Sequence, residues 1–198
     1  MWHYNGPSKE ALVNETKKWP TFLSEAKPPV VEVADGILMT PIFAEKDAAD
    51  FAEYLNEYPQ WGPAKGDAVP GDELRLHLLF PETFNTKYAK IDKFFQEIIN
   101  ARWNPTTWST VKDLFAIRYM MERQKEIRLH TDISRFSVSI VLERATRGGT
   151  LWFPRQNFTD DLVRPGVALV FPAPITHPHQ VTPVEEGRRT SLVIWTER

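Results

Sequence analysis

The sequence His130-Thr131-Asp132 is followed 49 residues later by His179, the last residue of the run Thr176-His177-Pro178-His179. Side chains alternate in direction along a β-strand, so a strand would project His130 and Asp132 from the same face. Two imidazoles and one carboxylate form the ligand set that holds non-haem Fe(II) while leaving coordination positions open. His130, Asp132 and one of the two late histidines are therefore predicted to form a metal site.

A candidate carboxylate-binding residue follows the late histidines. Arg189 lies ten residues beyond His179, on a predicted strand entered through Gly187. A guanidinium binds both oxygens of a carboxylate through its planar fork. It could hold the far end of a dicarboxylate whose near end chelates the metal, as a 2-oxoglutarate cosubstrate requires. Taken singly, a His-x-Asp run can arise by chance and Arg189 can be a solvated turn charge. The joint order and spacing favour the functional interpretation.

The composition is that of an ordinary globular protein. Of the 198 residues, 42% are hydrophobic and 25% charged, and the length favours one domain over residues 1–198. The absence of cysteine excludes disulfides and thiolate metal ligands. A formal net charge of −2 gives no basic footprint for nucleic acid. The N-terminus lacks the layout of a signal peptide, and no apolar run approaches the roughly 18 residues of a membrane span. A cytosolic protein without a membrane partner is expected.

Helical patterns precede strand patterns along the chain. Apolar residues recur at helical spacing over 45–58 and 85–101, where the second stripe comprises Tyr88, Ile91, Phe95 and Ile98. Strand-like runs are predicted at Val30–Val33, Ile37–Phe43, Glu73–Phe80, Leu114–Met121, Phe136–Leu142, Thr150–Phe153, Val167–Phe171, Gln180–Val184 and Thr190–Trp195. This order predicts a mainly β, jelly-roll fold. Residues 111–198 would form its β core, and residues 1–110 an arm and helices packed on one outer face.

Several motifs of the C-terminal half resemble those of the Fe(II)/2-oxoglutarate dioxygenases, most closely the prolyl and lysyl hydroxylase branch. They are Phe115-Ala116-Ile117-Arg118-Tyr119, His130-Thr131-Asp132, Gly148-Gly149-Thr150, Arg164-Pro165-Gly166 and the segment from Thr176 to Arg189. The stretch 115–195 is most similar to the catalytic domain of procollagen lysyl hydroxylases. Its His-x-Asp-x-Ser-x-Phe run corresponds to His130, Asp132, Ser134 and Phe136. The first 110 residues match only loosely.

The resemblance implies a double-stranded β-helix, a cupin-like jelly roll, that binds Fe(II) through His130, Asp132 and His179. Periodicity cannot choose between the two late histidines, because residues two apart on a strand share a face. The ten-residue interval to Arg189 matches the family when it is counted from His179. His177 is then expected to line the mouth of the active site.

The resemblance also implies the cosubstrates. Arg189 would bind the distal carboxylate of 2-oxoglutarate, with Tyr119 lining the same pocket and Ser191 assisting. Lysyl hydroxylases usually have an apolar residue in place of Ser191, so this position departs from their pattern. O2 is the further reactant, and ascorbate would act as a supporting reductant.

The implied reaction is hydroxylation of an unactivated C–H bond, with succinate and CO2 as co-products. The expected substrate is a lysyl or prolyl residue of a polypeptide, and the alternative is a free amino acid or another small molecule. Nucleic-acid demethylation is disfavoured by the charge and by Trp195, where that family carries a second arginine. A non-catalytic jelly-roll module that only binds a ligand is the alternative from a different functional class.

The loop after Gly148-Gly149 is expected to lie near the substrate. Trp152 should stand at the mouth of the site. Asp160 and Asp161 could attract a cationic lysine, although an exposed acidic loop is the plainer interpretation.

Overall fold

The computed structural model describes residues 14, 17–23, 28–63, 68–104 and 111–197. Its helices are α2 (Glu45–Asn56), α3 (Leu76–Leu79) and α4 (Pro81–Trp103), with a 3-10 turn at Pro154–Gln156. Its strands are β1 (Val31–Ala34), β2 (Ile37–Pro41), β3 (Asp72–Arg75), β4 (Val111–Met120), β5 (Ile127–His130), β6 (Phe136–Glu143), β7 (Arg147–Gly148), β8 (Leu151–Phe153), β9 (Phe158–Thr159), β10 (Val167–Pro172), β11 (His179–Val181), β12 (Val184–Glu186) and β13 (Arg188–Thr196).

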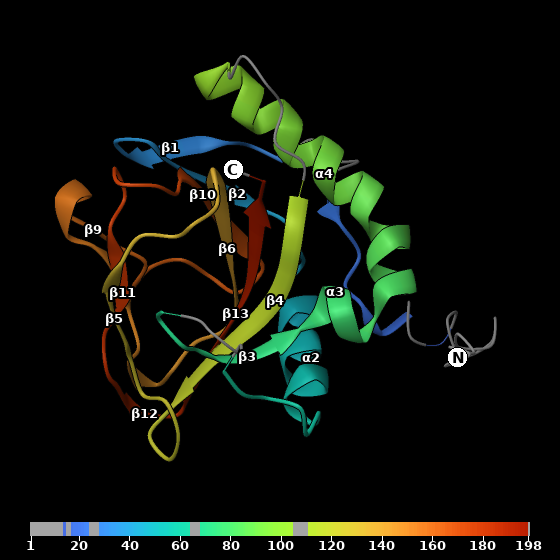
Figure 1. Ribbon diagram of the computed structural model, residues 1–198, viewed down its shortest axis with the longest axis vertical. Coiled ribbons are helices and arrows are strands. Elements are labelled where there is room, and N and C mark those ends of the chain that lie inside the picture. Colours follow the sequence, from blue (N-terminus) through green and yellow to red (C-terminus); the bar gives the residue numbers. More distant parts are fainter. Residues whose placement is uncertain (1–13, 15–16, 24–27, 64–67, 105–110, 198) are drawn as a thin grey trace.

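The strands form two antiparallel sheets and a short ribbon (Figure 1). The larger sheet has the order β1-β2-β10-β6-β13-β4-β3, and the smaller has the order β5-β11-β8-β9. One apolar cluster joins them, with Ile117 and Leu169 from the larger sheet and Leu151 and Val181 from the smaller. The sheets therefore face each other, as the jelly-roll prediction requires. Strands β1 to β3 belong to the larger sheet, so the β core is not confined to residues 111–198 as predicted.

Alternation along the central strands gives the larger sheet two apolar faces. On β4, Leu114 and Ala116 belong to the cluster on the helix side, whereas Phe115 and Ile117 belong to the cluster between the sheets. Strand β6 is buried at nearly every position for the same reason. A strand covered on both faces can place a functional side chain between the two sheets, while its alternate residues still pack against the helices.

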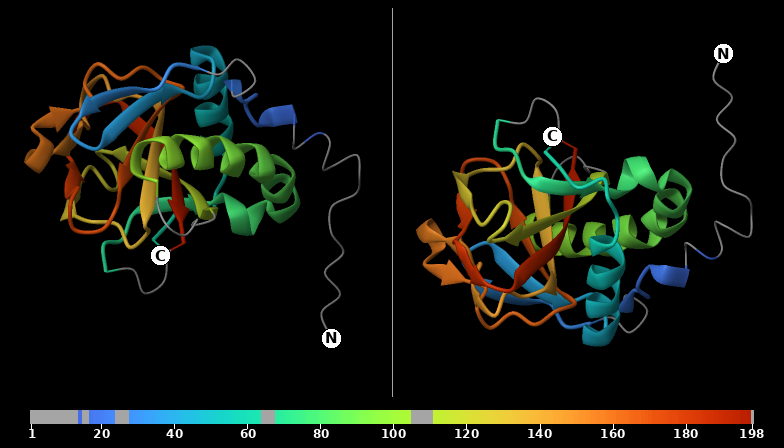
Figure 2. Two further views of the ribbon diagram at one scale, coloured as in Figure 1. Left: turned by 90° about the horizontal axis from the view of Figure 1, so that it is seen from above. Right: turned by 90° about the horizontal axis from the view of Figure 1, so that it is seen from below.

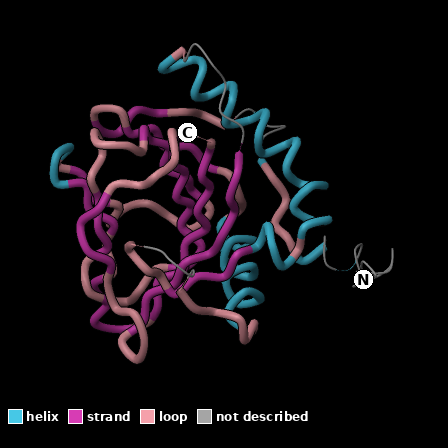
Figure 3. The backbone as a smooth tube through the Cα atoms, viewed as in Figure 1, coloured by secondary structure: helices cyan, strands magenta, loops and turns pink. Residues whose placement is uncertain are grey.

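Helices α2 and α4 lie on the outer face of the larger sheet, on the side away from the smaller sheet (Figures 2 and 3). Their buried residues recur at helical spacing and include Ala48, Phe51, Leu55, Ile91, Phe95 and Ile98. This confirms the predicted helices and their place on one outer face. The side chain of Tyr88 lies outside the described residues. None of the helices in the described ranges is long and apolar enough to cross a bilayer.

Two predicted strands are divided in the structure. The run Glu73–Phe80 was predicted as one strand, but pairing with β4 ends at Arg75 and the turn of helix α3 follows. A side-chain contact accompanies this helical turn, since Nδ1 of His77 lies 3.0 Å from the carbonyl oxygen of Leu114. The run Gln180–Val184 is divided into β11 and β12 near Pro183, whose nitrogen has no hydrogen to donate to a sheet.

Candidate metal centre

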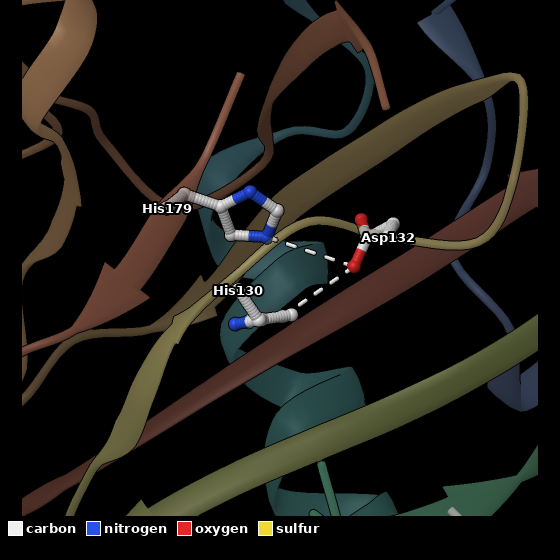
Figure 4. A group of neighbouring side chains, drawn as sticks. All are labelled: His130, Asp132 and His179. Atoms are coloured by element: carbon white, nitrogen blue, oxygen red, sulfur yellow. Dashed lines mark ion pairs between the residues drawn. The ribbon is translucent and has the colours of Figure 1, made fainter. Parts of the chain in front are cut away.

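Two histidines face each other across neighbouring strands. His130 ends β5, His179 begins β11, and the two are register partners in the smaller sheet. Their ring centroids are 4.5 Å apart. Asp132 lies beyond the end of β5, so strand alternation does not place it as the sequence suggested. The chain instead carries its carboxylate back beside the two rings after the strand has ended (Figure 4).

The Asp132 carboxylate lies close to both rings. Its Oδ1 is 3.4 Å from Nε2 of His130 and 3.7 Å from Nε2 of His179. One ligand atom from each residue lies within 4.8 Å of the other two. Ligand bonds of roughly 2.1 Å place ligand atoms roughly 3–4 Å apart around one cation. The three side chains therefore surround a position that one metal ion can occupy.

The backbone fixes which nitrogen of each ring is available. Nδ1 of His130 lies 2.8 Å from the carbonyl oxygen of Arg128, and Nδ1 of His179 lies 3.0 Å from that of His177. Because a carbonyl can only accept, each Nδ1 carries the proton and each Nε2 keeps its lone pair. Metal-ligating histidines in proteins are oriented by such contacts. The donor set fits Fe(II), which two histidines and one carboxylate bind with positions left open.

Ser137 orients the carboxylate. Its Oγ donates a 2.6 Å hydrogen bond to Oδ2 of Asp132, and Oγ of Ser134 lies 2.8 Å from Oγ of Ser137. Ser137 belongs to β6, so the larger sheet holds the side of the carboxylate that faces away from the histidines. Oδ1 is thereby directed to the two Nε2 atoms.

The electrostatics of the cluster favour an ionised Asp132 and a neutral His179. Burial lowers the pKa of His179, which favours the neutral imidazole that a ligand needs. Burial alone would raise the pKa of the Asp132 carboxyl, but the neighbouring His179 and His130 and the hydrogen bond from Ser137 hold it below its usual range. Burial also acts to lower the pKa of His130, and contact with Asp132 outweighs it, so this pKa is raised.

Substituting Ser137 by alanine is expected to weaken Fe(II) binding roughly tenfold, because the Asp132 carboxylate loses the donor that orients it. Anaerobic titration of the protein with Fe(II) measures this change. Ser139→Ala is the matched control, since Ser139 lies two residues further along the same strand and should leave the iron affinity unchanged. Equal affinities in the two variants would contradict the orienting role of Ser137.

A cavity lies beside the three predicted ligands and reaches both sheets. Strand β13 lines it with alternate residues, which share the inner face of the strand: Arg189, Ser191, Val193 and Trp195. Tyr119 of β4 is the register partner of Arg189 and also lines the cavity. The structure thus brings His130, Asp132 and His179 to the same cavity as Arg189, Tyr119 and Ser191.

The far end of this cavity is rich in hydrogen-bond donors. The Nε of Arg189 and the hydroxyl of Ser191 are buried and lack a hydrogen-bond partner among the described residues. Burial raises the pKa of Tyr119, although Arg189 acts in the opposite direction, so the phenol stays protonated. Unpartnered buried polar groups are destabilising, and a bound carboxylate would satisfy them. The donor set fits the distal carboxylate of 2-oxoglutarate.

Two residues predicted at the substrate mouth do not line the cavity itself. His177 is buried against the β1–β2 turn, where its Nε2 lies 3.1 Å from the carbonyl oxygen of Asp35. Trp152 is 37% exposed on β8. Neither is among the described residues that line the cavity. His177 contacts the β1–β2 turn instead, and Trp152 is partly exposed to solvent.

Two residues of the site gave no signal in the sequence, and a third was assigned the wrong environment. Ser137 orients Asp132, and Glu73 lines the cavity from β3. Asp160, which the sequence suggested as an exposed attraction for lysine, is instead fully buried and paired with Arg189. Glu73 and Asp160 are brought to the site by contacts between distant parts of the chain, which no local spacing reports. Ser137 is only five residues from Asp132, but their hydrogen bond depends on how the chain turns between β5 and β6.

The comparison of sequences supports this site. The sequence model described as 2OG-Fe(II) oxygenase superfamily matches residues 114–197. The human "Procollagen-lysine,2-oxoglutarate 5-dioxygenase 2" is 27% identical over 164 residues, which cover 75% of this chain and 22% of the relative. The mouse "Procollagen-lysine,2-oxoglutarate 5-dioxygenase 1" is 29% identical over 169 residues, which cover 79% and 23%. The chain spans less than a quarter of the length of these relatives.

Solved structures show the same fold. A viral collagen prolyl hydroxylase from Paramecium Bursaria Chlorella virus-1, in a 2OG complex, matches with a TM-score of 0.59 and 15% identity over 84% of this chain and 99% of that chain. A prolyl-4-hydroxylase from Pseudomonas putida matches with a TM-score of 0.61 and 18% identity over 82% and 92%. The likeness confirms the predicted double-stranded β-helix.

Proposed function

Because the chain belongs to the 2OG-Fe(II) oxygenase superfamily through residues 114–197, we propose that it hydroxylates a lysyl residue of a polypeptide, with a prolyl residue as the second candidate. His130, Asp132 and His179 hold the iron, and Arg189 binds the distal carboxylate of 2-oxoglutarate. One observation carries the proposal: the three ligands and the unpartnered donors of β13 line a single cavity. The whole chain is taken as one catalytic domain, since strands from both its halves share the larger sheet.

The residues of the chain have separate tasks in this reaction. Bound Fe(II), with 2-oxoglutarate and O2, supplies oxidative decarboxylation to succinate and CO2 coupled to hydroxylation of a C–H bond. Arg189, with Tyr119 and Ser191, would bind and orient the cosubstrate within the cavity that also holds the three iron ligands. Apolar side chains such as Phe115 and Phe171 line the walls between them and exclude water from the reacting groups.

A carboxylate in the cavity wall supports lysine over proline. Glu73 is 5% exposed, lines the cavity and forms a 3.1 Å ion pair with Arg75 that holds it in place. Tyr119 lines the same cavity. An anionic group in the wall of the cavity that holds the three ligands favours a substrate with a positive charge, which a lysyl side chain carries and a prolyl ring lacks.

Replacing Glu73 by glutamine is expected to raise the KM for a lysine-containing peptide roughly tenfold, because one charge-assisted contact of about 1.5–3 kcal/mol is lost. The KM for 2-oxoglutarate should not change. Steady-state succinate release measures both constants. Glu122→Gln, at an exposed position in the turn after β4, is the control. An unchanged KM for the peptide would exclude Glu73 from substrate recognition.

The proposed function itself is tested with a substrate panel. Peptides that differ only in lysine, proline or norleucine at one position, together with free lysine and proline, are incubated with Fe(II), 2-oxoglutarate and ascorbate. The expected result is succinate release and a gain of one oxygen atom on the lysine peptide, measured by mass spectrometry. If only a free amino acid is hydroxylated, the result would favour the alternative function, hydroxylation of a small molecule. Binding of 2-oxoglutarate without turnover on any of them would favour a non-catalytic binding module.

A further inference from the structure

A fully buried ion pair lies behind the donor end of the cavity. Nη2 of Arg189 is 2.7 Å from Oδ2 of Asp160, and the two side chains are 1% and 0% exposed. Arg189 lines the cavity, whereas Asp160 is absent from the described residues that line it. The Asp160 carboxylate therefore contacts the guanidinium from the side that faces away from the cavity.

The position of Asp160 is fixed by strand β8. Its Oδ1 accepts a 2.8 Å hydrogen bond from the backbone N–H of Leu151, and its own N–H donates a 3.0 Å hydrogen bond to the carbonyl oxygen of Leu151. On the other side of the guanidinium, Nη1 of Arg189 donates to the carbonyl oxygen of Gly149 at 2.9 Å. The two terminal nitrogens are thus held from two sides, and Nε is the atom left without a partner.

A second arginine balances the charge. Nη1 of Arg144 lies 3.7 Å from Oδ2 of Asp160 and donates hydrogen bonds to the carbonyl oxygens of Asp160 and Val163, at 2.7 and 3.2 Å. The three side chains carry a formal charge of +1 together. Asp161 also lies 4.0 Å from Nη2 of Arg144, but its side chain is 56% exposed, so solvent screens its charge more than that of the buried pair. With Asp160 and Arg189 alone, the pair would be neutral and would attract a dianion only weakly.

We propose that Asp160 is a positioning residue, which aims the Arg189 guanidinium at the distal carboxylate of 2-oxoglutarate, while Arg144 restores the positive charge that Asp160 removes. This inference rests on the proposed role of Arg189. Asp160, in the loop after Gly148-Gly149, would then act in binding the cosubstrate and not in binding the polypeptide. A carboxylate beside a binding arginine has two effects: it fixes the orientation of the guanidinium, and it reduces the positive charge.

Asp160→Asn distinguishes these effects because they have opposite signs. Removing the negative charge would tighten the binding of 2-oxoglutarate, whereas losing the orientation would weaken it. An asparagine has one oxygen for two donors, the Leu151 N–H and Nη2 of Arg189, so one donor must meet its amide hydrogens in either orientation. We expect the dissociation constant of 2-oxoglutarate from the anaerobic Fe(II)-loaded protein, measured by calorimetry, to rise roughly ten- to a hundredfold.

A ligand control isolates the distal carboxylate. The acid 2-oxopentanoate has the same metal-chelating end but no second carboxylate, so its dissociation constant should be the same in the wild type and in Asp160→Asn. Asp161→Asn is the matched protein control. Its carboxylate is 56% exposed, accepts hydrogen bonds from Thr150 and Thr159, and lies 4.0 Å from Arg144, whereas Asp160 contacts Arg189. It should leave both constants unchanged.

Arg144→Gln provides a second test, and the fold should tolerate it because the Arg144 side chain is 24% exposed. If Asp160→Asn does not fold, this variant tests the inference by itself. It should weaken the binding of 2-oxoglutarate, and the loss should diminish at high salt as screening reduces the contribution of charge. Unchanged or tighter binding in Asp160→Asn, or unchanged binding in Arg144→Gln, would overturn the inference while leaving the proposed function intact. Wild-type affinity for 2-oxoglutarate in an Arg189→Met variant would instead overturn the role of Arg189, and this inference with it.

Discussion

His179→Ala is expected to abolish iron-dependent turnover, while His177→Ala retains a measurable rate. Nε2 of His179 faces Oδ1 of Asp132 at 3.7 Å, so the substitution removes one of three converging ligands. Loss of a residue that only orients a ligand typically costs 10–100-fold in metal affinity. Loss of the ligand itself should therefore exceed roughly a hundredfold.

His177→Ala is the matched control because the two histidines are two residues apart and both are buried. His177 contacts Asp35 and Thr176 and does not reach the metal ligands with its ring. Its loss should lower the melting temperature, since the ring fills space beneath Gly36, and should leave Fe(II) affinity unchanged. Anaerobic Fe(II) titration and succinate release give the two readouts. Retained iron binding in His179→Ala, with loss of it in His177→Ala, would reverse the assignment.

Arg189→Met is expected to raise the KM for 2-oxoglutarate by roughly a hundredfold or more, with little effect on Fe(II) affinity. The methionine keeps an unbranched apolar stem but removes the guanidinium, including Nε, which lacks a hydrogen-bond partner among the described residues. Losing one partner of a buried, hydrogen-bonded charge pair costs about 2–5 kcal/mol. Each 1.4 kcal/mol is a factor of ten in an equilibrium constant.

Two further variants keep this test decisive. Arg188→Met removes the neighbouring arginine, whose guanidinium binds Glu143 through contacts of 2.7 and 3.0 Å, and it should not change the KM. Arg189→Lys keeps a charge beside Asp160 in case the methionine variant unfolds, and it should show an intermediate KM because an ammonium lacks the planar fork. An unchanged KM in both Arg189 variants would place the cosubstrate elsewhere.

Much of the fold follows from local patterns. The helical stripes of α2 and α4 and the runs that become β4, β6, β10 and β13 are long and regular, so their periodicity predicts both type and position. The run 73–80 was less predictable, because its apolar residues fit a strand and a helical turn equally well. There the pairing partner decides: β4 continues to pair with β3 only as far as Arg75.

The residues of the site also differ in how well the sequence predicted them. His130, Asp132, His179 and Arg189 were recognised from residue types and intervals, because metal and carboxylate binding restrict which side chains can serve. Asp160 was misread as an exposed acid. Its partner Arg189 lies 29 residues away, on a strand of the opposite sheet, and sequence distance carries no information about that contact.

By itself, the sequence determined the chemistry available to this protein: two imidazoles, one carboxylate and one guanidinium, at intervals that a double-stranded β-helix brings together. Only the tertiary structure decided how each group is presented. The protonated nitrogen of each histidine, the donor from Ser137, the carboxylate of Glu73 in the wall and the ion pair behind Arg189 all depend on strand register and burial. Glu73 and the ion pair behind Arg189 come from segments far apart in the chain, whereas the Ser137 and histidine contacts join residues two to five positions apart that the fold buries together. In each case the cost of burying an unpaired polar group selects the partner.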